Sequence, residues 1–228
     1  MAANLIPRDS LIVSCQAPVD SYLHNPVIIA AMARASVCRG AVAVRINTPD
    51  HIRATRAQIT QPIIGLWKQQ IPGYEVYITP RFEDAQAVAE AGADIIAIDA
   101  TQRSRPEGET PASLITKIHQ KLNKLVMADV DTIDAAIQAS EAGADFVATT
   151  LYGYTPATRN QSPPAWNLLT QLATKLKLPI LCEGGIGSPE MARKALDLGA
   201  YAVIIGTAIT GIDAQVMTYC RELAKKHP

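Results

Sequence analysis

The segment Glu90-Ala-Gly-Ala-Asp-Ile-Ile-Ala-Ile-Asp99 decides the fold, because variants of it recur along the chain. Residues 141–150 and 197–206 repeat it, and residues 38–46 form a fainter copy. In each copy a glycine ends a predicted helix, since glycine adopts the left-handed conformation at low cost. A short apolar run without alternation follows, which is typical of a parallel strand covered on both faces.

The glycines of these copies, Gly40, Gly92, Gly143 and Gly199, lie 52, 51 and 56 residues apart. Each interval has room for about two strand–helix units, so eight units are predicted in all. We therefore expect an α/β protein that forms a single (β/α)8 TIM barrel over residues 1–228. The strands are predicted at residues 11–16, 41–47, 62–68, 94–99, 124–129, 145–149, 179–183 and 201–206.

The composition argues against several classes of function. Lys plus Arg and Asp plus Glu number 21 each, so no net field attracts nucleic acid or an anionic membrane. No apolar run approaches the ~18 residues of a membrane span, and the first residues do not resemble a signal peptide. The cysteines lack metal-ligand spacing, which favours a reduced, cytoplasmic protein; they are Cys15, Cys38, Cys182 and Cys220.

Polar residues end nearly every predicted strand, where the interior of a packed barrel is apolar. The carboxyl ends of barrel strands meet at one rim, and this rim carries the chemistry of such folds. The convergence predicts a functional pocket. Its candidate residues are Gln16, Arg45, Lys68, Asp99, Asp129, Thr149, Glu183 and the pair Gly206-Thr207.

Lys68 is the first candidate for catalysis and ends the run Pro62-Ile-Ile-Gly-Leu-Trp-Lys68. A partly desolvated amine near Arg45 has a lowered pKa, which suits a general base or a Schiff-base nucleophile. A lysine that only extends into solvent is the structural alternative.

Three carboxylates of the same rim have two interpretations each. Glu183 lies across the barrel from Lys68 in strand order, either as a partner acid or base or as half of a structural salt bridge. Asp99 and Asp129 either orient substrate hydroxyls or balance Arg45 and Lys68. The substrate role is favoured for Asp129 and neither role for Asp99.

Glycines after the last two strands predict a phosphate site. Gly184-Gly185 follows the seventh strand and Gly206-Thr207 follows the eighth. Backbone amides of these loops, with a short extra helix at residues 208–211, form the phosphate site common in such barrels. The structural alternative is that Gly206 only makes a turn.

Two polar stretches, residues 102–108 and 152–164, are expected over the catalytic rim, and the second is long enough for a lid. The histidines fall on predicted helices or termini, which disfavours a histidine base or a zinc site; they are His24, His51, His119 and His227. No carboxylate cluster suits magnesium and no nucleotide-binding glycine motif is present. We therefore expect no metal and no cofactor.

Ordered motifs over nearly the whole chain resemble the N-acylglucosamine-6-phosphate 2-epimerases, also called N-acetylmannosamine-6-phosphate 2-epimerases. The motifs are Leu11-Ile-Val-Ser-Cys-Gln16, Gly40-Ala-Val-Ala-Val-Arg45, Pro62-Ile-Ile-Gly65 with Lys68, Ile78-Thr-Pro80, Ala93-Asp-Ile-Ile-Ala-Ile-Asp99 with Ala100-Thr101, Met127-Ala-Asp129, Thr149-Thr-Leu-Tyr-Gly-Tyr-Thr155 and Gly206-Thr-Ala-Ile-Thr210. The resemblance implies a β/α barrel that interconverts N-acetylmannosamine 6-phosphate and N-acetylglucosamine 6-phosphate in sialic acid breakdown, without a required metal or nucleotide.

The same resemblance implies roles for individual residues. It places the catalytic lysine on Lys68 and the catalytic glutamate on Glu183. The residues expected to bind substrate are Gln16, Arg45, Asp129, Thr149 and Tyr154.

The chain departs from this family at three places. It has Lys68-Gln-Gln70 where the family has Lys-Arg-Asp, Glu183-Gly-Gly185 where it has Glu-Gly-Arg, and Ala208-Ile-Thr-Gly211 where it has Ala-Ile-Thr-Arg. The catalytic pair is intact. Because Gly185 and Gly211 replace arginines, we expect the phosphate to be held by backbone amides, and more weakly.

The implied reaction begins with ring opening, because C2 of the sugar is acidic only beside a free aldehyde. Lys68 then removes the C2 proton, and its return to the other face inverts C2. Inversion by one base and by two bases both remain open. A Schiff-base aldolase or lyase and a non-catalytic sugar-phosphate-binding protein are the alternative functions, and a homodimer is compatible with the sequence.

Overall fold

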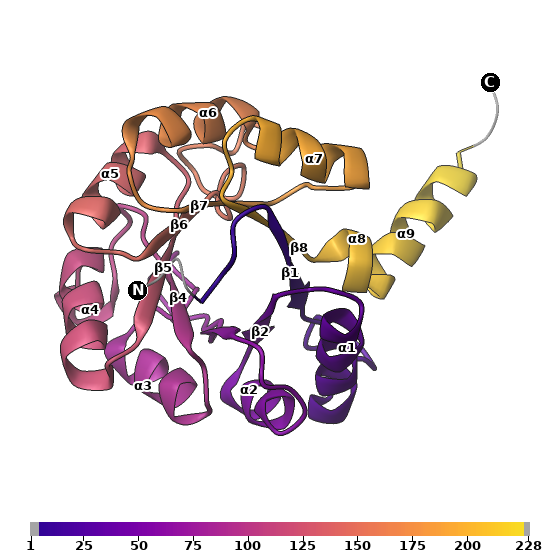
Figure 1. The fold of residues 1–228 in the computed structure, drawn as a ribbon, viewed down its shortest axis with the longest axis horizontal. Coiled ribbons are helices and arrows are strands. Elements are labelled where there is room, and N and C mark those ends of the chain that lie inside the picture. Colours follow the sequence, from indigo (N-terminus) through magenta and orange to yellow (C-terminus); the bar gives the residue numbers. More distant parts are fainter. Residues whose placement is uncertain (1–4, 226–228) are drawn as a thin grey trace.

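A computed structural model of the protein describes residues 5–225 and contains a closed barrel of parallel strands. Each strand pairs with its neighbours in sequence, and β8 pairs with β1 to close the barrel (Figure 1). The predicted (β/α)8 fold class is confirmed. The strands are β1 (Ser10–Cys15), β2 (Ala43–Asn47), β3 (Ile63–Leu66), β4 (Ile95–Asp99), β5 (Leu125–Asp129), β6 (Phe146–Ala148), β7 (Ile180–Glu183) and β8 (Ala202–Ile205).

Helices alternate with the strands and form an outer ring around most of the barrel (Figure 1). They are α1 (Pro26–Cys38), α2 (Pro49–Arg56), α3 (Phe82–Glu90), α4 (Pro111–Lys117), α5 (Ile133–Glu141), α6 (Trp166–Lys175), α7 (Pro189–Asp197), α8 (Thr207–Thr210) and α9 (Ile212–Leu223), with the short segments η2 (Pro106–Gly108) and η3 (Ile118–Leu122). Within residues 5–225, every helix is too short or too polar to cross a bilayer.

The predicted strands agree with the observed ones to within two residues at each end. The difference matters at the carboxyl ends, where the observed strands are shorter. Gln16, Thr149 and Gly206 each follow a strand by one residue, and Lys68 lies two residues beyond β3. Lys68 instead pairs in a single antiparallel bridge with Ile78.

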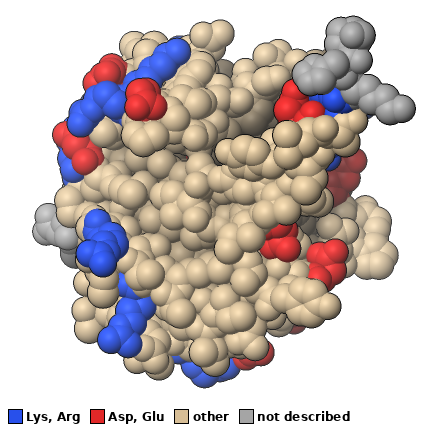
Figure 2. Space-filling view, turned by 90° about the vertical axis from the view of Figure 1, so that its right-hand side faces the viewer, with Lys and Arg blue, Asp and Glu red and all other residues tan. Residues whose placement is uncertain are grey.

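Helix α9 projects away from the barrel instead of covering it (Figure 1). None of its residues is buried, although the whole helix is described. Ile212, Val216, Tyr219 and Leu223 follow the spacing of one helical face and are 54%, 54%, 70% and 84% exposed. Figure 2 shows the side of the molecule from which α9 projects, and the centre of this side carries few charged residues.

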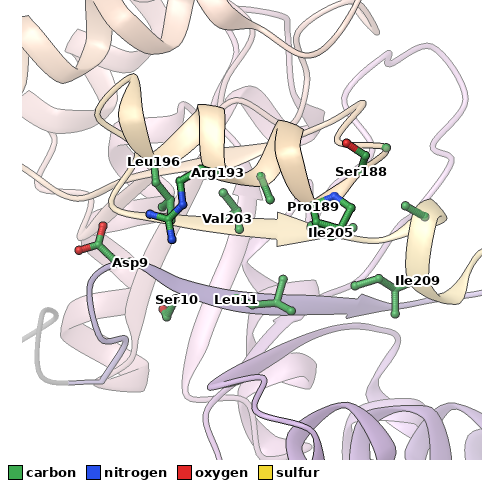
Figure 3. Close-up of a pocket in the computed structure, with 13 residues that line it drawn as sticks. Asp9, Ser10, Leu11, Ser188, Pro189, Arg193, Leu196, Val203, Ile205 and Ile209 are labelled. Carbon is green, nitrogen blue, oxygen red and sulfur yellow. The ribbon is translucent and has the colours of Figure 1, made fainter.

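A groove of about 440 Å³ remains where a helix would follow β8. Its walls come from α7, the outer faces of β1 and β8, and α8 (Figure 3). The apolar lining includes Leu11, Leu196, Val203, Ile205 and Ile209, while Asp9 and Arg193 lie together at one end. Within residues 5–225, therefore, no helix occupies the eighth position of the helical ring.

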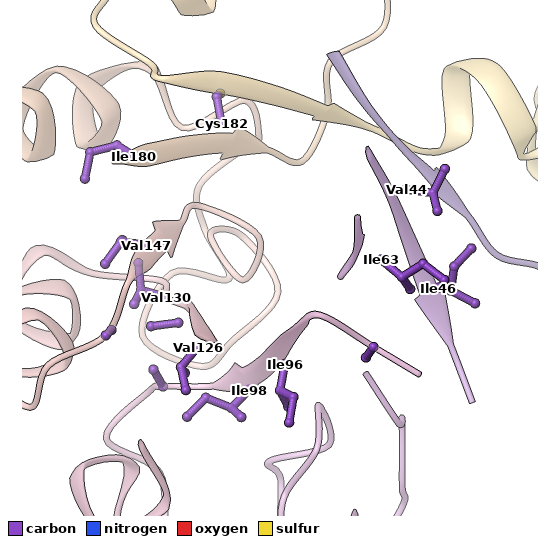
Figure 4. Packing of buried hydrophobic residues seen from close by; sticks show 14 of the residues in the cluster. Val44, Ile46, Ile63, Ile96, Ile98, Val126, Val130, Val147, Ile180 and Cys182 are labelled. Atoms are coloured by element: carbon purple, nitrogen blue, oxygen red, sulfur yellow. The ribbon is translucent and has the colours of Figure 1, made fainter. Parts of the chain in front are cut away.

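The rest of the outer layer is well packed. Outward side chains of the strands, such as Val44, Ile63, Ile96 and Val147, meet the helices in a continuous apolar cluster (Figure 4). A second cluster fills the inside of the barrel, with Ile64, Met127, Phe146 and other inward side chains at its centre. The inner cluster forms the floor beneath the polar rim.

Candidate active site

Alternation along the strands brings the polar residues to the barrel axis. Successive side chains of a strand point to opposite faces, so the inner set recurs at every second residue. Leu66, Met127, Ala148 and Leu181 belong to the inner apolar cluster. Two residues later along the chain, the same inward direction predicts the positions of Lys68, Asp129, Thr150 and Glu183.

Four of the inward residues form a closed ring of contacts, which we call the four-residue ring: Arg45, Asp129, Thr150 and Glu183. Arg45 Nη2 lies 2.5 Å from Asp129 Oδ2, and Arg45 Nη1 lies 2.5 Å from Glu183 Oε1. Thr150 Oγ1 lies 2.6 Å from Asp129 Oδ1 and 2.9 Å from Glu183 Oε2. The ring joins β2, β5 and β7 across the mouth of the barrel.

Burial and neighbouring charges set the protonation of this ring. Burial would lower the pKa of Arg45, but the Asp129 and Glu183 carboxylates outweigh it and raise the pKa. Burial raises the pKa of Asp129 to about 7 against the opposing charge of Arg45, and Glu183 adds to the rise. Asp129 is fully buried, so a single cation shared with Glu183 does not offset its desolvation.

Lys68 lies beside the ring and reaches the open mouth of the barrel. Its side chain is exposed to solvent at this opening. Protein atoms nevertheless surround the opening on most sides, and they desolvate the amine. The Lys68 amide donates to Asn47 Oδ1 at 2.9 Å, which fixes the backbone. Among residues 5–225, no hydrogen bond or ion pair holds the Lys68 Nζ. Desolvation and then the charge of Arg45 lower its pKa, as predicted from the sequence.

Two polar atoms of the site lack partners within the described part of the chain. Gln16 Nε2 donates to Ser14 Oγ at 2.8 Å, but Gln16 Oε1 is buried without a hydrogen bond. Arg45 Nε is in the same condition. Since buried polar groups are rarely left unpaired, one acceptor and one donor remain available for a ligand.

Thr149 and Tyr154, both predicted to bind substrate, lie outside the ring. Thr149 points outward, where its hydroxyl donates to the Glu183 carbonyl and accepts from the Glu183 amide, at 2.9 and 3.1 Å. Tyr154 is 59% exposed in the loop after β6. Their contacts with substrate remain predictions.

Asp99 is not paired with Arg45 or Lys68, contrary to one of its two predicted roles. Arg103 Nη2 lies 2.7 Å from Asp99 Oδ2, and Arg105 Nη2 lies 3.9 Å from Asp99 Oδ1. Thr101 donates to the same Oδ1 through its amide and its hydroxyl. The fully buried carboxylate therefore anchors the loop at residues 102–108.

The family described as "NanE: Putative N-acetylmannosamine-6-phosphate epimerase" matches residues 29–225. The chain belongs to this family.

Relatives of the same name cover almost the whole chain. The protein named "Putative N-acetylmannosamine-6-phosphate 2-epimerase" in Thermosynechococcus vestitus is 62% identical over 95% of this chain and 94% of its own. The one in Synechococcus elongatus is 57% identical over the same shares. The solved N-acetylmannosamine-6-phosphate 2-epimerase from Clostridium perfringens superposes with a TM-score of 0.92 at 37% identity, covering 97% of this chain and 96% of that chain.

Two residues of the site, Thr150 and Tyr77, are not among those predicted from the sequence. The strand ends predict Thr149, but the inward-facing alternation through Phe146 and Ala148 leads to Thr150. Tyr77 precedes Ile78, the partner of Lys68 in the antiparallel bridge, and packs against the inner apolar cluster. Burial and then the Asp129 charge raise the pKa of Tyr77. No sequence signal identifies Tyr77, because it lies in a loop.

The predicted phosphate loops of this epimerase family member lie side by side. Because Glu183 pairs with Ile204, Gly185 and Gly206 each lie two residues beyond this pair, just after the ends of the neighbouring strands β7 and β8. A Cβ at Gly185 would meet the Pro163 carbonyl carbon at 2.7 Å, and one at Gly211 would meet the Thr207 Cα at 2.7 Å. Backbone of Pro163 and Pro164 thus crowds Gly185, and the preceding turn of α8 crowds Gly211, the two positions where the resemblance implies arginine.

The loop at residues 152–164 is tied to the body of the protein. Thr155 donates to Asp131 Oδ2 at 2.6 Å, and the Gly153 amide donates to the Thr158 hydroxyl at 2.9 Å. These bonds hold the predicted lid in its observed position.

Histidines lie away from the four-residue ring. His24 lies in the loop before α1 rather than on a helix, with its ring centroid 4.6 Å from that of His51 in α2. His119 contacts Asp145 at 2.9 Å, and His227 lies outside the described residues. Among residues 5–225, no three His, Cys, Asp or Glu side chains are grouped as metal ligands would be.

Proposed function

We propose that this protein is an isomerase that inverts C2 of N-acetylmannosamine 6-phosphate and gives N-acetylglucosamine 6-phosphate without a cofactor. The observation that carries the proposal is the amine of Lys68, which has a lowered pKa and stands beside the four-residue ring. The names of the relatives supply the substrate. Sialic acid breakdown is the setting that fits this substrate.

The reaction begins from the open-chain aldehyde, because only then does the C1 carbonyl stabilise charge left by loss of the C2 proton. The neutral Lys68 amine takes that proton and becomes an ammonium, and the sugar becomes an enolate with charge on O1. If the Lys68 ammonium delivers its proton to the opposite face of C2, the epimer forms and the neutral amine is restored. If a second acid delivers the proton instead, the ammonium afterwards loses its own proton to solvent and the acid is reprotonated. The lowered pKa of Lys68 increases the fraction of neutral amine that can act as a general base.

Unpaired polar atoms of the site suit the rest of the sugar. The Arg45 Nε–H is a charged donor available to the developing charge on O1. Gln16 Oε1 accepts from a hydroxyl or from the acetamido N–H. The amides of Gly184, Gly185, Gly206 and Thr207 are the candidates for holding the 6-phosphate, so that binding energy at the far end positions C2 over Lys68.

Proton NMR in deuterated water tests the function directly. On incubation with N-acetylmannosamine 6-phosphate, we expect the C2 proton signal to disappear as N-acetylglucosamine 6-phosphate forms. Free N-acetylmannosamine should react more slowly. Binding without any exchange at C2 would overturn the proposal in favour of a sugar-phosphate-binding protein.

Two further experiments distinguish a general-base mechanism from a Schiff-base mechanism, and inversion by one base from inversion by two. Sodium borohydride with substrate should leave Lys68 unmodified, whereas a trapped adduct would indicate the Schiff-base aldolase or lyase. In a single turnover, partial return of the substrate's own proton to the product would indicate that Lys68 acts alone. Complete replacement by deuterium would favour a second acid such as Glu183.

We also propose that two copies form a homodimer in which the α9 of one copy fills the groove of the other. The apolar face of α9 and the apolar groove are complementary, and each lacks a partner within residues 5–225. Only Gly211 separates α8 from α9, and Ser21 donates to Asp213 Oδ2 at 2.9 Å, so the first turn of α9 is held outward. Full burial of each large apolar side chain stabilises by about 1.5–3 kcal/mol.

Sedimentation equilibrium tests the dimer at micromolar protein. We expect a dimer for the native chain and a monomer for Val216→Asp, which puts a charge on the apolar face. Thr218→Asp is the matched control, because Thr218 is exposed on another face of α9. A monomeric native chain, with α9 folded into its own groove, would contradict the dimer.

A cytoplasmic location remains a proposal of the same kind. All four cysteines are free thiols, two of them buried. Free thiols are the rule in reducing compartments.

A further inference from the structure

With both carboxyl groups ionised, the four-residue ring has too few hydrogens for all of its close contacts to be hydrogen bonds. Two oxygens, Asp129 Oδ2 and Glu183 Oε1, face Arg45, and each accepts from one of its Nη–H groups. The other two, Asp129 Oδ1 and Glu183 Oε2, both lie within hydrogen-bond distance of Thr150 Oγ1. A hydroxyl has one hydrogen to donate, whereas an ionised carboxylate only accepts. If both carboxyl groups are ionised, one of the two contacts would therefore bring a lone pair of Thr150 Oγ1 against a lone pair of a carboxylate oxygen.

One additional proton resolves the conflict. With a proton on either carboxyl, the order becomes carboxyl O–H to Thr150 Oγ1, and Thr150 O–H to the other carboxylate. We propose that Thr150 is a positioning residue that holds this shared proton between Asp129 and Glu183, so that the pair carries one negative charge and Lys68 stays neutral.

The charges of the site agree with this arrangement. One cation and two carboxylates leave the ring with a net negative charge, and the shared proton makes it neutral. Asp129 is fully buried and Glu183 is 11% exposed, so a neutral ring avoids the cost of an uncompensated buried charge. The raised pKa of Asp129, about 7, is consistent with a proton held there near neutral pH.

Lys68 is the group that gains from the shared proton. The other titratable groups near the ring are Tyr77 and Asp99, and Asp99 is already paired with Arg103. The charges of Glu183 and Asp129 raise the pKa of Lys68 against its desolvation, so a fully ionised pair would favour the ammonium, which cannot act as a base. Thr150 thus keeps the proton on the carboxyl pair rather than on Lys68. The inference rests on the proposed function only for its effect on rate.

Infrared spectroscopy of the free protein tests the shared proton without substrate. At pH 6, below the pKa of Asp129, we expect a carbonyl band of a protonated carboxylic acid in the native protein. The band should be lost or moved in Asp129→Asn and in Glu183→Gln, and it should weaken in Thr150→Val, which keeps the shape but removes the hydroxyl. Thr150→Ser, the matched control, should retain it. Absence of the band in the native protein would overturn the proposal, even if the protein proves to be an epimerase.

Kinetics give the second measurement. Thr150→Val leaves the base in place, so we expect kcat to fall about ten- to a hundred-fold, less than for loss of a base, with a small change in KM. Thr150→Ser should stay within about threefold of the native rate. Thermal melting of both variants establishes that they are folded. A Thr150→Val variant with the native band and the native kcat would reduce Thr150 to a structural residue.

Discussion

Arg45 Nη1 and Glu183 Oε1 lie 2.5 Å apart, so the inward residues of β2 and β7 meet across the mouth of the barrel. The arginine side chain is 3% exposed and the glutamate side chain 11%, so both are already held in position before substrate binds. A fixed array of charges of this kind costs little reorganisation during reaction.

Replacement of Lys68 by alanine should remove epimerisation and leave the fold intact. Loss of a general base costs on the order of a hundred- to ten-thousand-fold in kcat. Deuterium exchange at C2 and thermal melting measure the two effects. Lys175→Ala is the control, because Lys175 is exposed at the end of α6, away from the rim. Near-native exchange in Lys68→Ala would remove this residue from the mechanism.

The stability of the protein should depend on pH through Asp129. Its pKa is about 7 in the folded protein against 3.8 for an ordinary aspartate, so the folded state keeps a proton that the unfolded chain has released. This contribution is present below the unfolded pKa and is lost as the pH rises through the folded value. In urea unfolding from pH 4 to 8, Asp129→Asn should therefore gain stability relative to the native protein as the pH rises. A pH-independent difference would contradict the raised pKa.

A side chain at Gly185 should destabilise the protein rather than restore an arginine contact. Gly185 has φ +70°, and its Cβ would lie within 3 Å of Pro163 and Pro164 backbone atoms. Such strain costs on the order of 1–3 kcal/mol. Gly185→Ala should lower the melting temperature, whereas Gly187→Ala in the same loop should not, since its Cβ would meet only Met191 Sδ at 3.8 Å. Equal melting temperatures would show that the Pro163-Pro164 backbone yields easily.

Activity should survive exhaustive EDTA treatment. The Arg45 guanidinium lies between Asp129 and Glu183, where a metal ion would otherwise balance these carboxylates. We expect the same rate of C2 exchange before and after chelation, measured by NMR. Loss of activity that zinc or magnesium restores would show that the carboxylates bind a metal in the working enzyme.

The barrel was predictable from the sequence because helix ends and buried strands leave local patterns. Gly92 and Gly143 mark helix ends, and both have the positive φ that the repeats imply. The position of α9 was not predictable in this way. An apolar helical face shows that burial is needed, but it does not specify which surface provides it.

The candidate site was predicted from strand ends, and the choice between adjacent residues required the alternation rule. Thr149 is the last residue of its predicted strand, but it points outward to the backbone of β7. Thr150 points inward to the ring. The packing of Tyr77 against the inner apolar cluster arises from a loop, depends on long-range folding and leaves no local pattern.

The empty eighth position of the helical ring has a genetic consequence. If copies exchange α9, a substitution in the groove acts on the helix of the other copy. A defective chain paired with a normal chain would keep one of the two exchanged interfaces, so the mutation would be recessive. A chain with a damaged groove and a chain with a damaged α9 would also complement each other, since one of the two exchanged interfaces would be intact.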